Sequence, residues 1–252
     1  MHLGDWEKIR SKILYSFLLF VVSLAVGILA AVVVEHCAQT RQRETQIENA
    51  HTDYKAASAS GGKQSDELTK KVALTFDDGP NPDYTPVLLD ELKKRGVPAT
   101  FFVLGTEVEQ YPKLVRRASE EGHLIGVHSY KHVNLRQLSD QQAVEQVNRT
   151  NEAIHAACGQ YASYIRPPYG CWKEDLDYEV QMVEVLWDID PRDWATTSAD
   201  LVVQRVLQDV EENSIILLHD ASESSVRAAC MIIDRLQAQG YTFVTVEELL
   251  ME

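Results

Sequence analysis

The stretch VALTFDDGP, residues 72–80, decides the fold of this chain. Residues 72–76 are almost entirely apolar, and a short apolar run that ends in turn-forming residues is typical of a buried strand. Two carboxylates, Asp77 and Asp78, follow at once, and a glycine and a proline then favour a turn. Active sites of α/β folds form just after the strands, so the stretch predicts a central strand with a site at its carboxyl end.

Downstream of this stretch, short apolar runs alternate with longer amphipathic segments. We expect strands at residues 72–76, 99–104, 123–127, 164–165, 185–189, 215–218 and 242–246, and helices at 85–95, 112–121, 139–157, shortly after Trp172, 199–212 and 226–239. This repetition predicts an α/β fold with a parallel sheet. About seven strands in about 180 residues favour a distorted (β/α) barrel over a full eightfold one, with a doubly wound open sheet as the alternative. No G-x-G-x-x-G pattern follows the first strand, so dinucleotide binding has no support.

The composition is that of a globular protein, with 45% hydrophobic and 25% charged residues. The formal net charge of −14 argues against nucleic acid as a partner, because phosphate binding needs a basic surface. Residues 72–252 hold 15 Lys/Arg and 30 Asp/Glu, a difference of −15. Such a surface suits neutral or amine-bearing glycans better than anionic partners.

Residues 13–34 are 22 consecutive residues without a charge. As a helix at about 1.5 Å per residue they would span about 33 Å, enough to cross a bilayer. Lys8, Arg10 and Lys12 precede this span and Glu35 follows it, so the positive-inside rule places the following domain outside the cell membrane. A cleaved signal peptide is the alternative, but its apolar region is normally about 7–15 residues long. We therefore expect a single-pass membrane anchor.

The predicted organisation has four parts: a cytoplasmic tail at 1–12, a transmembrane signal-anchor helix at 13–34, an extracytoplasmic stalk at 35–70 and a catalytic domain at 71–252. The stalk is polar, balanced in charge and poor in large apolar residues, as linkers are. The four cysteines are Cys37, Cys158, Cys171 and Cys230. They lack C-x-x-C spacing, so a cysteine zinc site is unsupported and we expect structural or incidental roles.

Residues 128–132, HSYKH, follow the third predicted strand and hold two candidate metal ligands. His128 and His132 would share a face if the backbone made a helical turn, a common spacing for two imidazoles on one metal. With Asp78 as an oxygen ligand they would leave a position open for water, as in catalytic zinc sites. In an extended chain the neighbouring Asp77 would point the other way and could serve another purpose. Taken alone, the first motif could be a simple turn and the histidine pair a coincidence.

Three more polar clusters follow predicted strands: RPPYG at 166–170, DPRDW at 190–194 and LLHD at 217–220. Singly, Trp194 could be a core residue and His219 a structural histidine. The five motifs TFDDGP, HSYKH, RPPYG, DPRDW and LLHD occur in this order, and in this the chain resembles the polysaccharide deacetylase family with the NodB homology domain, carbohydrate esterase family four. The resemblance covers about residues 71–252. It implies a metal-dependent, distorted (β/α) barrel that removes N-acetyl groups from peptidoglycan or chitin, or O-acetyl groups from xylan.

Carried over by position, the resemblance implies a role for each motif residue. Asp77 would be the general base, held charged and oriented by Arg166. Asp78, His128 and His132 would bind a divalent metal, for which zinc is the expected ion. Val127 departs from the family pattern, in which asparagine often precedes the first histidine.

The remaining roles concern the acid and the substrate. Asp193 would orient and charge His219, the general acid. The backbone N–H of Tyr169 would help to stabilise the oxyanion, and Trp194 and Leu217 would shape a pocket for the acetyl methyl group.

We therefore expect an N-deacetylase that acts on an N-acetylated polysaccharide, above all on the amino sugars of cell-wall peptidoglycan, because a tethered outward domain would reach wall glycan directly. Two alternatives stay open: a deacetylase of another exported or chitin-like polysaccharide, and a non-catalytic glycan-binding pseudoenzyme. Candidates for every catalytic role count against the pseudoenzyme.

Overall fold

The chain is described by a computed structural model over residues 70–173, 176 and 180–251. The predicted tail (1–12), the predicted membrane segment (13–34), Cys37 and nearly all of the predicted stalk lie outside these residues. Within the described ranges, no helix combines the length and the apolar character that crossing a membrane requires. Cys158, Cys171 and Cys230 are free thiols.

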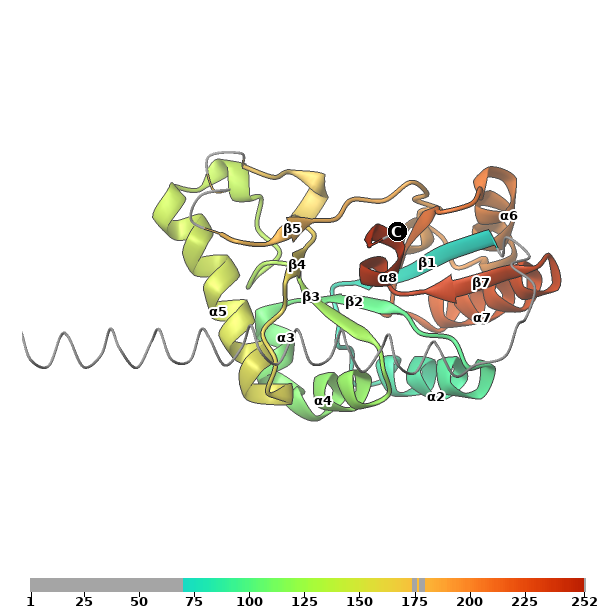
Figure 1. Cartoon of the computed structure of the whole chain (residues 1–252), viewed down its shortest axis with the longest axis horizontal. Helices are drawn as coiled ribbons and strands as arrows, with labels where there is room; N and C mark the ends of the chain where they lie inside the picture. Colours follow the sequence, from blue (N-terminus) through green and yellow to red (C-terminus); the bar gives the residue numbers. More distant parts are fainter. Residues whose placement is uncertain (1–69, 174–175, 177–179, 252) are drawn as a thin grey trace, which may run out of the picture. The chain divides into compact units, whose positions relative to one another are not determined.

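Seven parallel strands form one sheet (Figure 1). They are β1 (Lys70–Asp77), β2 (Thr100–Val103), β3 (Leu124–Val127), β4 (Tyr164–Ile165), β5 (Val183–Glu184), β6 (Ile215–His219) and β7 (Tyr241–Val244). Their order is β5-β4-β3-β2-β1-β6, and β7 also pairs with β1. β1 is buried from its third residue onward, as its apolar sequence predicts. The predicted parallel sheet of about seven strands is confirmed.

The two ends of the sheet meet through an irregular segment, which closes it toward a barrel. Ile189 forms a parallel bridge with Ile216 of β6, and the Leu217 N–H donates to the Ile189 carbonyl at 2.9 Å. The predicted strand at 185–189 is therefore wrong, because β5 lies earlier and only this bridge remains. The physical reason is that the Val185 and Leu186 carbonyls accept hydrogen bonds from the Arg166 side chain, not from a neighbouring strand.

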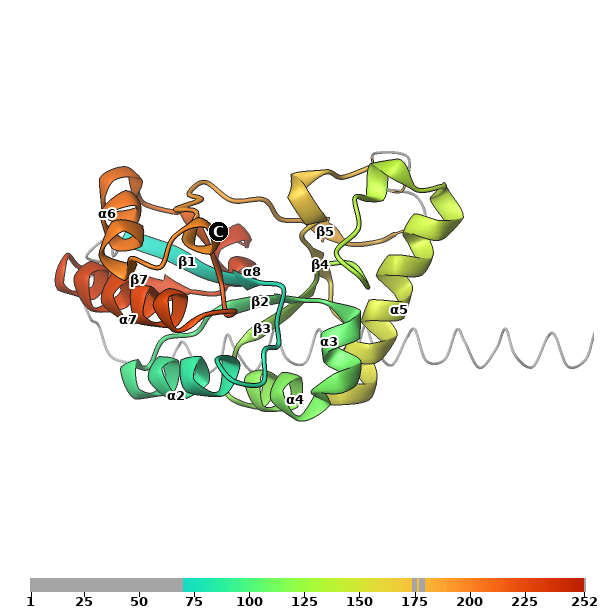
Figure 2. The ribbon, with the colours of Figure 1, turned by 180° about the vertical axis from the view of Figure 1, so that it is seen from behind.

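Helices lie on the outside of the strands in both ribbon views (Figures 1 and 2). They are α2 (Thr85–Arg95), α3 (Gly105–Gln110), α4 (Pro112–Glu120), α5 (Asp140–Cys158), α6 (Ala199–Asp209), α7 (Glu223–Ala238) and α8 (Val246–Leu250). Contacts join α3 and α4 to α5, and α2 and α6 to α7. The short helices α3 and α8 were not predicted, because one or two turns are too few to produce a helical period in the sequence.

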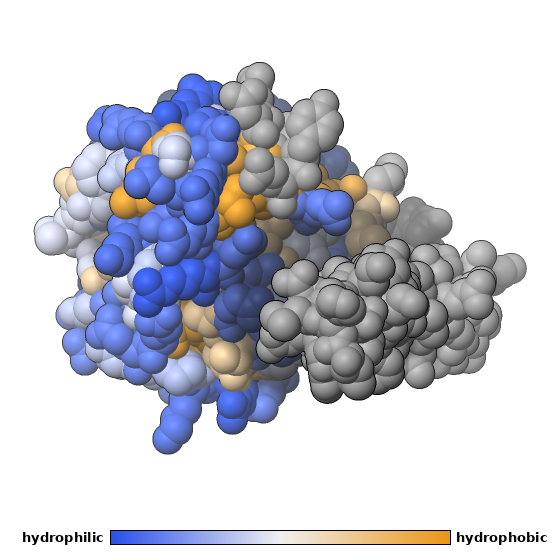
Figure 3. Space-filling model, turned by 90° about the vertical axis from the view of Figure 1, so that its left-hand side faces the viewer, coloured by the Kyte–Doolittle hydropathy of each residue, from blue (hydrophilic) through white to orange (hydrophobic). Residues whose placement is uncertain are grey.

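Local sequence explains where the long helices begin and end. Helix α2 has a proline in its first turn and ends at Gly96, whose φ of 63° suits glycine. Helix α5 begins with a capping box between Ser139 and Gln142. The side of the molecule that carries α5 is mostly hydrophilic, with small separate hydrophobic patches (Figure 3). The apolar residues of α5 face inward, and Val147 and Ile154 among them are buried.

Candidate active site

The turn after β1 places two neighbouring carboxylates in different surroundings. Asp77, the last residue of β1, is buried with 3% of its surface exposed. Asp78 has a φ of 72°, in the left-handed region, and its side chain is 36% exposed. The expectation of an extended chain at this pair was thus wrong, and both carboxylates approach His128: Asp77 Oδ2 lies 3.8 Å and Asp78 Oδ1 lies 3.4 Å from its Nε2. A left-handed aspartate is uncommon and indicates that the surrounding structure fixes this turn.

The loop after β3 brings the two histidines together without a helical turn. His128 is buried and His132 is about one-third exposed. Ser129 and His132 adopt positive φ values of 65° and 53°, so the predicted helical turn is wrong. These left-handed residues bend the loop, and the two imidazole rings lie with their centres 5.1 Å apart.

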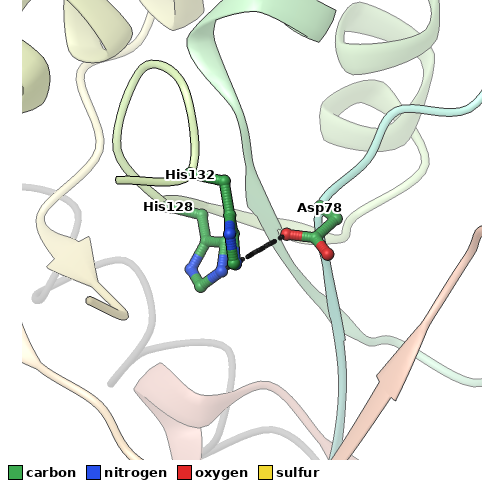
Figure 4. Close-up of side chains that lie close together, drawn as sticks. All are labelled: Asp78, His128 and His132. Atoms are coloured by element: carbon green, nitrogen blue, oxygen red, sulfur yellow. Dashed lines mark ion pairs between the residues drawn. The ribbon is translucent and has the colours of Figure 1, made fainter. Parts of the chain in front are cut away.

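Asp78, His128 and His132 form a cluster that fits a divalent cation (Figure 4). One ligand atom from each residue can be chosen so that all lie within 4.8 Å of one another. Asp78 Oδ1 lies 3.4 Å from Nε2 of both histidines and has no hydrogen-bond partner in the described part of the chain. A carboxylate oxygen facing two imidazole nitrogens is a donor set that zinc prefers.

A backbone contact prepares His128 for this purpose. Nδ1 of His128 lies 2.7 Å from the carbonyl oxygen of Arg166, which can only accept, so Nδ1 carries the proton. Nε2 is therefore left with a lone pair that faces Asp78. Burial lowers the pKa of His128 below its ordinary value, which keeps the ring neutral as a metal ligand requires.

Arg166 fills the inside of the barrel beneath the cluster. Its side chain has no exposed surface, and Nη1 donates to Asp77 Oδ1 at 2.8 Å and to Thr75 Oγ1 at 2.7 Å. Its other donors reach the segment after β5, and its guanidinium stacks 4.3 Å from the centre of the Phe102 ring. A buried charge is tolerated when it is paired and fully hydrogen-bonded, so Arg166 is held in the interior by these contacts and fixes the position of the Asp77 side chain.

Next to the cluster, Asp193 fixes the orientation of His219. His219 ends β6 and is the register partner of Asp77 across β1. Asp193 accepts hydrogen bonds from His219 Nδ1 at 2.8 Å and from the His219 backbone N–H at 2.9 Å. Burial disfavours the charged imidazole, but Asp193 outweighs it and, with the neighbouring carboxylates, raises the pKa of His219 to about 9. At neutral pH His219 therefore carries a proton, and its Nε2 lies 3.9 Å from Asp78 Oδ2.

These residues open into a cavity of about 1080 Å³. Leu217 is buried in its wall, whereas Tyr169 and Trp194 are exposed aromatic residues on its lining, at 64% and 61%. The Tyr169 ring packs edge-on against His132 with centres 4.7 Å apart, and its φ of 62° places the backbone in the left-handed region. Exposed aromatic faces beside polar groups are the usual surface for sugar rings. The structure thus gathers all ten predicted site residues around one region.

Several lining residues were not predicted from the sequence. They are Trp187, Asp190, Ala195, Thr196, Thr197, Ala221, Ser222, Ser224 and Ser225. Ser225 also hydrogen-bonds to Asp193. Asp190 belongs to the predicted motif DPRDW, which was a usable signal, whereas short hydroxyl residues at the start of α7 resemble ordinary helix caps.

Comparison with known proteins gives several related deacetylases. Residues 64–185 match the family model described as polysaccharide deacetylase. The peptidoglycan-N-acetylglucosamine deacetylase PgdA of Listeria monocytogenes is 39% identical over 73% of this chain and 39% of its own length. The chitooligosaccharide deacetylase of Rhizobium leguminosarum bv. trifolii is 42% identical over 69% of this chain and 88% of its own.

A solved structure agrees with these sequence matches. The peptidoglycan deacetylase PdaC of Bacillus subtilis has a TM-score of 0.71 and 42% identity, covering 73% of this chain and 92% of the solved chain. The full PdaC sequence, a peptidoglycan-N-acetylmuramic acid deacetylase, is 36% identical over 90% of this chain and 49% of its own length. This chain therefore spans less than half of the length of PgdA and of PdaC.

Proposed function

The chain belongs to the polysaccharide deacetylase family, and on that premise we propose that it is a metal-dependent hydrolase that removes N-acetyl groups from the amino sugars of peptidoglycan. One observation carries the proposal. A cluster of two histidines and an aspartate lies next to a carboxylate held by a buried arginine and to an imidazole held by a buried aspartate. Amide hydrolysis needs this set of a Lewis acid site, a base and an acid.

Each side chain has a task that its surroundings support. A bound divalent cation, for which we propose zinc, would polarise the acetyl carbonyl and acidify the attacking water. Asp77, paired with Arg166, would take the water proton as general base. His219, kept protonated by Asp193, would give a proton to the departing sugar amine.

The other predicted residues would serve the substrate. The Tyr169 backbone N–H would stabilise the oxyanion, while Trp194 and Leu217 would enclose the acetyl methyl group. Thr196, Thr197 and the serines on the lining offer hydrogen bonds to sugar hydroxyls. A glycan-binding pseudoenzyme is the weaker alternative, because a chain that only binds has no need for both a held base and a held acid.

Metal removal tests the function directly. The full chain in detergent should release acetate from N-acetylated peptidoglycan fragments and lose this activity after chelation, with recovery on adding zinc. His132→Ala removes a ligand from the cluster and should lose both metal and activity. Mass spectrometry of muropeptides and chitooligosaccharides would show which sugar loses the mass of an acetyl group. Full activity in exhaustively chelated protein would contradict the proposal.

Asp193→Asn should shift the pH dependence of the activity. His219 has to be protonated to donate, and its pKa of about 9 extends that state into the alkaline range. Loss of the Asp193 charge lowers this pKa toward the ordinary value of about 6.5, so activity should fall at a lower pH. We expect about a tenfold lower rate at neutral pH with unchanged metal content. A pH–rate profile with an unmoved alkaline limb would remove Asp193 from this role.

We also propose that residues 13–34 anchor the chain and hold the catalytic domain outside the cell membrane, where it would reach wall glycan. Protease added to intact protoplasts should then remove the domain from about residue 60 onward. Immunodetection of a cytoplasmic protein after the same digestion shows whether the protoplasts have lysed. Protection of the domain until the protoplasts lyse would place it inside and exclude wall glycan as its substrate.

A further inference from the structure

A buried carboxyl group lies under the active site and has no part in the chemistry above. Asp220 directly follows His219 and is 1% exposed. Strands β1 and β6 are parallel, with Asp77 opposite His219. The residues that leave these strands, Asp78 and Asp220, therefore come out side by side, one toward the proposed metal and the other beneath the turn.

One hydrogen bond to Thr85, and two more between Thr85 and Asn81, link Asp220 to the segment that follows Asp78. The hydroxyl of Thr85, at the start of α2, donates to Asp220 Oδ2. The same hydroxyl accepts from the Asn81 N–H at 2.7 Å, and the Thr85 N–H donates to the Asn81 carbonyl at 3.1 Å. Thr85 is itself 2% exposed, so this chain of contacts is shielded from water. Asp220 thus connects the end of β6 to the far end of the turn that carries Asp78.

Direct packing fixes the near end of the same turn. A Cβ atom placed on Gly79 would lie 2.5 Å and 2.6 Å from the two carboxylate oxygens of Asp220. Gly79 is not among the glycines with positive φ, so its backbone does not require glycine. Residue 79 has to lack a side chain because the carboxyl group of Asp220 lies against the backbone there, next to Asp78.

The ionised form of this carboxyl group is energetically unfavourable in the interior. Asp220 makes no ion pair within the described residues, and its Oδ1 has no hydrogen-bond partner there. Burial disfavours its ionised form and raises the pKa of Asp220 to about 6. A buried carboxyl with one unpartnered oxygen destabilises a fold by itself, so its presence indicates a gain elsewhere in the site.

We propose that Asp220 is a positioning residue for the metal ligand Asp78: with Thr85 it clamps the turn between β1 and α2 against the end of β6, so that Asp78 faces His128 and His132. The proposal rests on the metal site of the proposed function. It adds a second task to the LLHD motif, in which His219 acts on the substrate and Asp220 holds the metal-binding turn.

Zinc affinity, measured by competition with a chromophoric chelator on the full chain in detergent, tests the clamp without any enzyme assay. Asp220→Ala and Thr85→Val should each weaken zinc binding by about 10- to 100-fold, as losses of outer support for metal ligands do. Thr85→Ser keeps the hydroxyl and should retain wild-type affinity. Asp83→Ala removes an exposed carboxyl group from the same turn and is the matched control, with no expected change.

A double variant separates the clamp from general damage. Gly79→Ala alone should weaken zinc binding, because its methyl group collides with the Asp220 carboxyl. In Gly79→Ala combined with Asp220→Ala that collision is gone, so affinity should equal that of Asp220→Ala alone. Additive losses would mean that the two residues act separately and would overturn the proposal.

Unchanged zinc affinity in Thr85→Val and Asp220→Ala, each folded by circular dichroism, would also overturn it. If Asp220→Ala does not fold, the comparison of Thr85→Val with Thr85→Ser decides alone, because valine preserves the shape of the buried side chain. A wild-type chain that binds zinc but deacetylates nothing would refute the proposed function and leave the clamp standing.

Discussion

Asp77→Asn should lower the deacetylation rate by about 10²- to 10⁴-fold while the metal stays bound, since this is the range that a positioned general base contributes. Asparagine keeps the shape of the side chain and can still accept a hydrogen bond from Arg166, which lies 2.8 Å away. It cannot take a proton from water. The unfolding temperature should also fall, because the buried Arg166 loses its counter-charge.

Asp78→Asn is the matching variant, because it makes the same carboxylate-to-amide change at the next residue. Asp78 Oδ1 faces both imidazoles, so its variant should lose metal affinity first and activity as a consequence. Metal content by atomic emission, measured on folded protein, distinguishes the two. Equal metal loss in both variants would show that the base and the ligand have been assigned to the wrong residues.

His219→Ala should affect substrates according to their leaving groups. A departing sugar amine has to be protonated, so loss of the acid should cost about 10²- to 10⁴-fold on an N-acetylated sugar. An activated acetate ester, whose leaving group departs without a proton, should lose less than about tenfold. The contrast arises from the chemistry alone, because both acetyl groups would occupy the same cavity beside Leu217.

The two rates have to be compared in folded, metal-loaded protein. His219 ends β6, and its backbone N–H also donates a hydrogen bond to Asp193, so a loss of structure has to be distinguished from the loss of the acid. Such a loss would depress both substrates alike. Equal losses on amide and ester would therefore retire the general-acid assignment, whereas a large difference would support it.

Much of this fold follows from local patterns in the sequence. The run at 72–76 is apolar except for Thr75 because β1 is buried on both faces, and helix α2 occupies the predicted residues 85–95. Most of the predicted site residues converge because they lie at or just after the carboxyl ends of parallel strands, and such ends share one edge of the sheet. Asp193 and Trp194 instead follow the bridge between Ile189 and β6. Family resemblance supplied the roles, and strand position explains why the residues meet.

The errors came where tertiary contacts replace local rules. The segment 185–189 has the composition of a strand, but the Arg166 side chain takes its carbonyl groups. Left-handed residues at Asp78, Ser129 and His132 depend on the surrounding packing, which no local propensity reports. The position of Asp220 against Gly79 joins residues about 140 apart in sequence, so only the folded chain brings it to light.

Arg166 has an evolutionary consequence. Its buried side chain packs inside the barrel and is also the counter-ion of the general base. Selection therefore retains Arg166 for folding as well as for catalysis. The side chains of Asp78 and His132 are partly exposed, at 36% and 31%, so substitutions there cost the core less than substitutions at Arg166. A descendant that gave up catalysis while keeping its cavity would therefore change at Asp78 and His132 first. Its Arg166–Asp77 pair would persist as an inherited structural element long after the reaction was gone.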